Sequence, residues 1–164
     1  MQTDWQEIVR RHGPGVFRAA WRVLGHEADA EDVVQGVFLE AHRLWREQPA
    51  AEWVGILRSM ATRRALDRLR QRRPQATDDE INALPAADDP VAEAIGRELA
   101  QRLGQALGQL APREAEVFCL RYFEDLSYQQ IAEQLSISAT AVSTALNKAR
   151  GKLELLLDQA RAGD

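Results

Sequence analysis

Residues 128–147, YQQIAEQLSISATAVSTALN, constrain the fold more than any other stretch, because their small and apolar residues follow a helix-turn-helix pattern. Ile131 lies on the first predicted helix and Val142 on the second, so both helices bury one face together. Ala132 leaves room for the second helix to cross the first closely. We therefore expect two short helices joined by a turn of three to four residues.

Serines mark where both of these helices should begin. Ser127 has Gln130 three residues later, which is the spacing of a capping box, and Ser138 can cap the second helix. A helix-turn-helix places its second helix in the major groove of duplex DNA. The sequence thus predicts that this chain contacts promoter-like DNA.

The composition excludes several other classes of protein. The chain has 164 residues and 45% apolar content, enough for one domain or two small ones, but no apolar run that could span a membrane. Its single cysteine, Cys119, excludes an internal disulfide, and its three histidines lack metal-ligand spacing. The first residues contain no apolar segment of the signal-peptide kind, so we expect a cytoplasmic protein. Neither an acid–base pair nor a metal-ligand cluster stands out, so we expect no cofactor, no metal and no enzymatic activity.

Charge is distributed unevenly although the net charge is only −4. Residues 1–73 carry 13 basic and 10 acidic side chains, whereas residues 74–96 carry 6 acidic ones and no Lys or Arg. Residues 74–90 also contain three prolines and lack helical periodicity, which favours a flexible acidic linker over the alternative of an ordered surface loop. The predicted division is an N-terminal domain over 1–73, a linker over 74–95 and a C-terminal domain over 96–164.

Apolar spacing of three and four residues predicts an all-α chain. We expect the sequence Gly13-Pro14-Gly15 to stop a first short helix, and Gly25 and Pro49 to end the second and third. The fourth helix changes from an apolar first half to a strongly basic second half. The expected helices cover residues 4–12, 16–24, 29–47, 51–71, 91–110, 112–123 and 128–135, with a last one from Ser138 to about residue 157.

Four stretches in order resemble the extracytoplasmic-function group of bacterial sigma factors. DAEDVVQGVF at 29–38 is similar to the group's polymerase-binding helix, and ALDRLR at 65–70 to the end of its −10-binding helix. LAPRE at 110–114, followed by residues 118–128, is similar to the helix that leads into the C-terminal domain. The helix-turn-helix completes the match. The resemblance implies two helical domains that bind core RNA polymerase and promoter DNA, and an anti-sigma factor as a further partner.

The resemblance also assigns a polymerase-binding face. Glu31, Asp32 and Gln35 lie on a different side of their predicted helix from Val33 and Val37. A solvated face is the ordinary interpretation of such residues. The resemblance instead implies that these three side chains contact core polymerase.

Basic residues near the end of the fourth helix are the candidates for the −10 element. Six arginines occur within eleven residues, 63–73, opposed only by Asp67, and such a strip binds phosphates through counterion release. Trp45 and Trp53 flank a loop that captures a flipped base in the resembled group, although core packing is the alternative for both rings. The predicted −10 residues are Trp53, Arg63, Arg64, Arg68 and Arg70.

The second helix of the helix-turn-helix supplies the candidates for the −35 element. Its first turns are rich in Ser and Thr, which discriminate bases less well than Arg does, so this helix is expected to be a weak reader. Lys148, Arg150 and Lys152 are better suited to phosphates. The predicted −35 residues are Thr140, Ser143, Thr144, Asn147, Lys148 and Arg150.

Two other functions remain open at this point. A conventional helix-turn-helix regulator would dimerise and bind a palindrome without polymerase. A sigma-like interaction protein would serve mainly as the partner of an anti-sigma regulator. The sequence DAEDVVQGVF favours the sigma factor over the first alternative.

Overall fold

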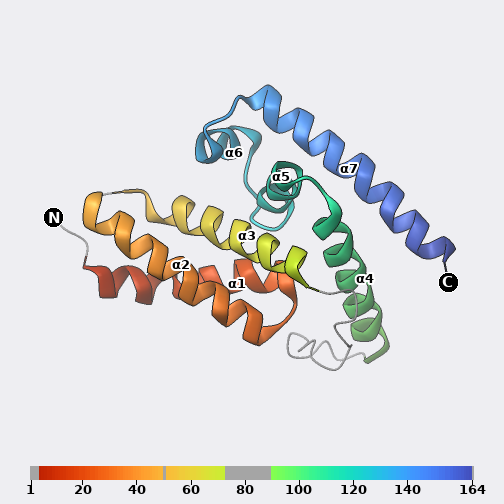
Figure 1. Cartoon of the computed structure of the whole chain (residues 1–164), viewed down its shortest axis with the longest axis horizontal. Coiled ribbons are helices and arrows are strands. Elements are labelled where there is room, and N and C mark those ends of the chain that lie inside the picture. Colours follow the sequence, from red (N-terminus) through yellow and green to blue (C-terminus); the bar gives the residue numbers. More distant parts are fainter. Residues whose placement is uncertain (1–3, 50, 73–89, 164) are drawn as a thin grey trace.

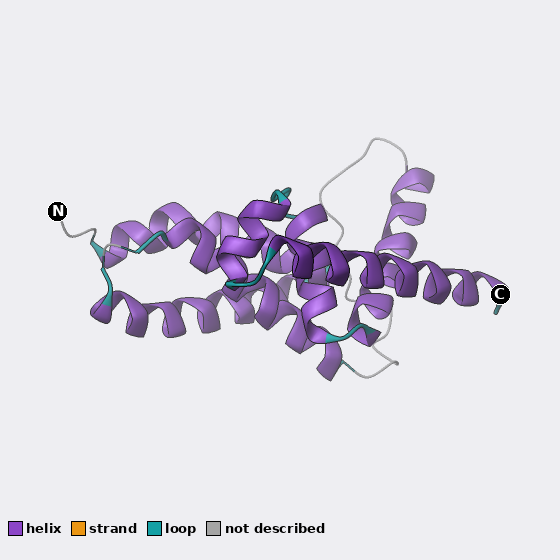
Figure 2. Ribbon diagram, turned by 90° about the horizontal axis from the view of Figure 1, so that it is seen from above, coloured by secondary structure: helices purple, strands orange, loops and turns teal. Residues whose placement is uncertain are grey.

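The computed structural model describes residues 4–49, 51–72 and 90–163, and every regular element in these ranges is a helix (Figures 1 and 2). The predicted residues 74–89 of the linker lie outside the described residues. Helix α4 already begins at Pro90, so residues 90–95, which we assigned to the linker, are helical. The helices are α1 (Trp5–Leu24), α2 (Glu27–Glu47), α3 (Trp53–Gln71), α4 (Pro90–Gln109), α5 (Pro112–Tyr122), α6 (Tyr128–Leu135) and α7 (Ala139–Ala162).

Helix α1 corrects one prediction, because it runs through Pro14 without a break. A proline normally disfavours helical backbone at the residue before it through a clash with that residue's Cβ, and Gly13 has no Cβ. Ile8 and Val16, on either side of Pro14, are both buried, so packing holds the two segments in one helix. Gly25 ends α1 as predicted, with a left-handed φ of 61° and its N–H donating to the Trp21 carbonyl.

The N-terminal helices α1, α2 and α3 pack on one another around the predicted apolar stripes. Val33, Val37 and Ala41 of α2 are fully or nearly fully buried, as are Leu57 and Ala61 of α3. Helix α2 starts two residues earlier than expected, because the His26 Nδ1 accepts a hydrogen bond from the Asp29 N–H at 3.2 Å and caps the helix.

The C-terminal helices α4–α7 form two clusters rather than one. Ile131, Ala132, Val142 and Leu146 make a core inside the helix-turn-helix, as predicted. A second set of buried residues from the C-terminal half packs with the core of α1–α3, and this shared core therefore includes residues from both halves of the chain. The residues of this shared core that come from α4, α5, α7 and the turn between α4 and α5 are Ala106, Leu107, Leu110, Ala115, Cys119, Ala149 and Leu153.

Helix α3 lies at the centre of this arrangement. It contacts α1 and α2 on one side and α4, α5 and α6 on the other, and Figure 1 shows it between the two groups. Glycine allows α4 to come close: a Cβ at Gly104 or Gly108 would already touch Leu69 of α3 at 3.8 Å. The candidate −10 helix is therefore also the helix that joins the two halves.

Candidate nucleic-acid interface

The helix-turn-helix is built from local hydrogen bonds that the sequence specifies. The Gln130 N–H donates to Ser127 Oγ at 3.1 Å, and the Ser127 N–H donates to Gln130 Oε1 at 2.8 Å, which completes the predicted capping box. Ser138 caps α7 by accepting from the Ala141 N–H at 3.0 Å. Between the helices, Ser136 adopts a left-handed φ of 55°. These contacts fix the angle at which α7 leaves the turn.

The first turns of α7 present the candidate −35 residues to solvent. Thr140, Thr144 and Asn147 are exposed and Ser143 is half-buried, whereas Val142 on the opposite face is fully buried. Lys148 is also exposed. The helix therefore offers hydroxyl and amide groups at the places where base edges would be read.

The basic residues further along α7 are held by neighbouring side chains. The Arg150 guanidinium donates hydrogen bonds to the Tyr122 hydroxyl and lies 5.4 Å from the centre of that ring. Lys152 Nζ donates to both carboxylate oxygens of Glu114, at 3.0 and 2.8 Å. Tyr122 thus positions one candidate phosphate contact, and Glu114 partly neutralises another cation.

Acidic residues of α2 neutralise much of the arginine strip on α3. Arg64 Nη2 lies 2.9 Å from Glu40, and Arg68 Nη2 lies 2.8 Å from Asp29 and 3.0 Å from Asp32. These arginines are 40–43% exposed, so their ion pairs are solvated and add little stability. Phosphate groups could replace such weak partners.

Arg63 and Arg70 face the C-terminal helices instead. Arg63 Nε is 3.9 Å from Glu116 of α5, and Arg70 Nη2 donates to the Leu110 carbonyl at 3.4 Å. Burial raises the pKa of Glu116 despite the nearby guanidinium groups of Arg63 and Arg113. The structure therefore does not gather all four predicted arginines on one free surface.

Trp53 occupies a core position rather than an exposed one. It is 6% exposed, its ring centre lies 6.3 Å from that of Trp5, and its indole N–H donates to the Pro49 carbonyl at 3.5 Å. Trp45 is half-buried beside Trp5. These contacts match the core-packing alternative for both rings and place Trp53 beneath the loop before α3.

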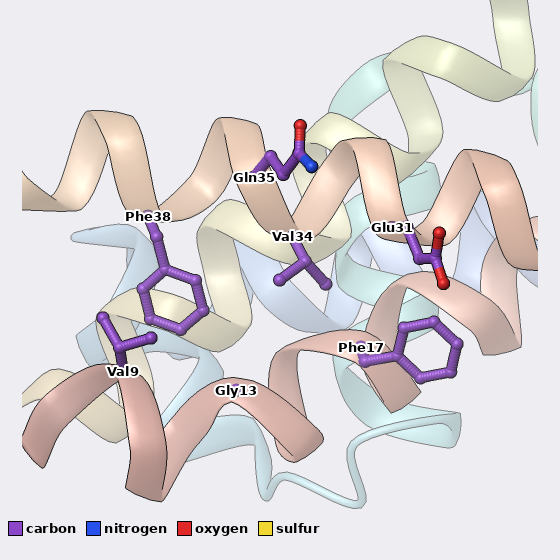
Figure 3. Close-up of a pocket in the computed structure, with 7 residues that line it drawn as sticks. All are labelled: Val9, Gly13, Phe17, Glu31, Val34, Gln35 and Phe38. Carbon is purple, nitrogen blue, oxygen red and sulfur yellow. The ribbon is translucent and has the colours of Figure 1, made fainter. Parts of the chain in front are cut away.

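The predicted polymerase-binding residues lie together on the outer side of α2. Glu31, Asp32 and Gln35 are all exposed. Glu31 and Gln35 border a groove of about 290 Å³ between α1 and α2, shown in Figure 3. The other residues that line this groove are Val9, Gly13, Phe17, Val34 and Phe38.

Asp29 links this face to the arginine strip. Partial burial acts to raise its pKa, but hydrogen bonds from Arg72 and Arg68 outweigh that effect and lower it. Arg72 also donates to the Leu24 carbonyl at 2.8 Å. Asp29 therefore stays ionised and ties the start of α2 to the end of α3.

Sequence reasoning missed the residues that join the two halves. The Glu124 carboxylate lies 3.4 Å from Arg22 Nη1 and 3.6 Å from Arg58 Nε, and its side chain is only 7% exposed. The Arg22–Glu124 pair spans 102 residues of chain. Ser59 Oγ and Gln134 Oε1 form a second such contact at 2.9 Å. Spacing along the chain carries no signal for partners so far apart.

The described residues give no support for a metal-binding site or for a redox-active thiol. Within these ranges no group of three or more His, Cys, Asp or Glu residues is arranged to hold a metal ion. Cys119 is 1% exposed, and burial raises the pKa of its thiol, so this residue is part of the core. None of the described helices combines the length and apolar character needed to cross a bilayer.

Comparison with known proteins identifies both halves of the chain. The family models for Sigma-70 region 2 and for Sigma-70, region 4 match residues 8–75 and 100–153. The RNA polymerase sigma factor CnrH of Cupriavidus metallidurans is 31% identical over 169 residues, covering 96% of this chain and 88% of CnrH. The ECF RNA polymerase sigma factor SigE of Mycolicibacterium smegmatis is 31% identical over 155 residues, and the chain spans 60% of its length.

Solved structures agree with this result. The structure of CnrH in complex with the cytosolic domain of CnrY has a TM-score of 0.63 and 29% identity, covering 94% of this chain and 88% of that one. RpoE in complex with the anti-sigma factor NepR from Bartonella quintana, at 17% identity and a TM-score of 0.60, supports the fold alone. The chain belongs to the sigma-70 family of RNA polymerase sigma factors, in its extracytoplasmic-function group. It is thus a factor that directs promoter-specific transcription. The comparisons do not favour the alternative of a conventional helix-turn-helix regulator.

Proposed function

We propose that α2 binds core RNA polymerase through Glu31, Asp32 and Gln35. One observation carries this assignment: three exposed polar side chains share one side of a helix whose opposite side, at Val33 and Val37, is buried. None of the three side chains is buried, and the contact of Asp32 with Arg68 is a solvent-exposed ion pair. Such a face can be changed without loss of the fold, which makes the assignment testable.

The two DNA contacts are divided between α3 and α7. The α3 arginines supply phosphate affinity near the −10 element, and the exposed groups of α7 read the −35 element. The carboxylates of Glu40, Asp29 and Asp32 hold the arginines until phosphates replace them. The chain carries out no chemistry of its own and acts in the cytoplasm, where it meets polymerase and DNA.

An anti-sigma protein is a further partner by analogy with relatives. The CnrH structure holds the cytosolic domain of CnrY, and the RpoE structure holds the anti-sigma factor NepR. A protein of this kind would regulate the present chain by competing for the surfaces that polymerase and DNA use.

Run-off transcription with core polymerase tests the assignment of α2. The double variant Asp32→Asn with Gln35→Ala should weaken core binding and lower transcript yield, while circular dichroism stays unchanged. Asp158→Asn with Gln159→Ala makes the same chemical changes at two exposed positions near the end of α7 and should leave both unchanged. Equal core binding by the two double variants would contradict the role of this face.

A further inference from the structure

Arg150 of α7 is held by two tyrosines from the helices that precede it. Its Nε donates a hydrogen bond to the Tyr122 hydroxyl at 2.6 Å, its Nη2 donates to the same oxygen, and the guanidinium lies 5.4 Å from the centre of that ring. Hydrogen bonds to Tyr122 and, less strongly, to Tyr128 raise the pKa of Arg150. Side chains from the end of α5 and the start of α6 therefore fix one cation of α7.

The Tyr122 ring is itself fixed from below. Its centre lies 4.7 Å from that of Phe118, one turn earlier on α5, and Phe118 packs against both hydrophobic cores. The rest of Tyr122 lies in solvent, because the residue is 46% exposed. The phenol is thus anchored by its ring and accessible to a partner outside the protein.

The partners of Arg150 are neutral, unlike those of the α3 arginines. Arg64 and Arg68 lie against carboxylates of α2, which offset their charge. The hydroxyls of Tyr122 and Tyr128 hold the Arg150 guanidinium without offsetting its charge. Arg150 therefore keeps its positive charge in a fixed orientation, which suits the binding of an anion.

These side chains lie beside the groups that we propose read the −35 element. Arg150 lies one helical turn beyond Asn147, so the two share one side of α7, and both are exposed. In a helix-turn-helix, the first helix crosses the DNA backbone while the second lies in the groove. Tyr128 begins that first helix, α6, and Tyr122 ends the helix before it. Phosphates that flank the groove therefore pass the end of the domain where Tyr122 and Arg150 meet.

The Tyr122 hydroxyl retains a donor for such a phosphate. A tyrosine oxygen can accept hydrogen bonds through its lone pairs and donate one through its O–H, whereas a guanidinium only donates. The contacts with Arg150 therefore use lone pairs of the Tyr122 oxygen and leave its O–H to donate. A phosphate oxygen can accept from this O–H while the guanidinium supplies the charge.

We propose that Tyr122 and Arg150 form one phosphate-binding site at the edge of the −35 helix. Arg150 supplies the charge, and Tyr122 both fixes the guanidinium and donates its own O–H to the same phosphate. The inference rests on the proposed function, because this phosphate flanks the −35 element. It adds a residue of α5, outside the helix-turn-helix, that contributes affinity without reading sequence.

The variant Tyr122→Phe tests the hydroxyl, because it keeps the ring and the contact with Phe118. Holoenzyme made with this variant should need an about three- to tenfold higher concentration for half-maximal binding to a responsive promoter, the effect of one hydrogen bond. The salt dependence of binding and the preference among −35 sequences should not change, since neither a charge nor a base contact is lost. Binding equal to that of the wild type would overturn the proposal.

The variant Arg150→Gln separates the charge from the hydroxyl. It should weaken binding and reduce the slope of log affinity against log salt concentration by about one, as the loss of one phosphate contact does. Arg161→Gln removes the same charge from an exposed site near the end of α7 and should change neither. In the Arg150→Gln background, Tyr122→Phe should cost less affinity than in the wild type, because the two side chains act on one phosphate. Equal costs in both backgrounds would contradict a shared site.

Promoter DNA with a single neutral phosphate locates the contact. Methylphosphonate replaces a charged phosphate oxygen by a methyl group, and it is placed at each position around the −35 element in turn. At one position the wild type and Tyr122→Phe should bind equally; a difference that persisted at every position would overturn the proposal. A wild-type holoenzyme that neither bound nor transcribed any promoter would refute the proposed function and this site with it. Normal transcription by the wild type and by Tyr122→Phe alike would refute this site alone.

Discussion

Ser136 bears the conformational cost of the turn on which the −35 helix depends. Its φ is 55°, in the left-handed region where a side chain costs roughly 1–2 kcal/mol. The backbone nonetheless adopts this conformation, because the Ile137 N–H donates to the Ala132 carbonyl at 3.0 Å and closes the end of α6. Cβ packing does not explain a serine here, since the side chain is exposed.

Replacing Ser136 by glycine should therefore stabilise the protein. Glycine removes the Cβ clash but loses more entropy on folding, so we expect a net gain of about 0.5 kcal/mol in the free energy of unfolding. Thermal denaturation should show a rise in Tm of about 1–2 °C. Ser136→Ala keeps the Cβ and should give no rise. If alanine stabilised the chain as much as glycine, the φ angle would not be the cause.

At the scale of helices, local signals predicted most elements and failed where distant contacts decide. The Ser127–Gln130 spacing and Gly25 were sufficient to place helix ends, because their hydrogen bonds are local. The prediction that a helix ends at Pro14 was wrong, because the burial of Ile8 and Val16 outweighs the local stop signal. The arginine strip was recognised by its sequence density, but its acidic partners on α2 and α5 become neighbours only in the folded chain.

Substitutions in α3 and substitutions in α7 should affect transcription in different ways. Neutralising Arg64 and Arg68 to Gln should lower transcription from all responsive promoters and flatten its dependence on salt, because fewer counterions are released. Changing Thr144 or Asn147 of α7 to Ala should alter which −35 sequences work, because base-edge groups carry specificity. Run-off transcription over a small set of −35 variants at several salt concentrations separates the two effects. An arginine variant that reshuffled −35 preference would reverse these roles.

At the scale of the whole molecule, one core couples halves that have different functions. Leu107 and Leu153 pack with the same cluster as Ile8 and Leu57. This shared core ties the stability of α1–α3 to that of the C-terminal helices. All four tryptophans precede residue 54, so their fluorescence reports on α1–α3 alone. The chain therefore carries a natural probe for whether the halves unfold together.

The variant Leu146→Ala, in the helix-turn-helix core, tests whether the two halves of the chain unfold together. Leu146 is fully buried in the helix-turn-helix core, and its truncation should lower the free energy of unfolding by about 2–5 kcal/mol. If the two halves unfold together, the midpoint followed by tryptophan fluorescence should fall as much as the midpoint followed by circular dichroism. Leu155→Ala, at a site that is 64% exposed, should move neither midpoint. A fall in the circular dichroism midpoint alone would mean that α1–α3 unfold independently, and the shared core would then contribute little to stability.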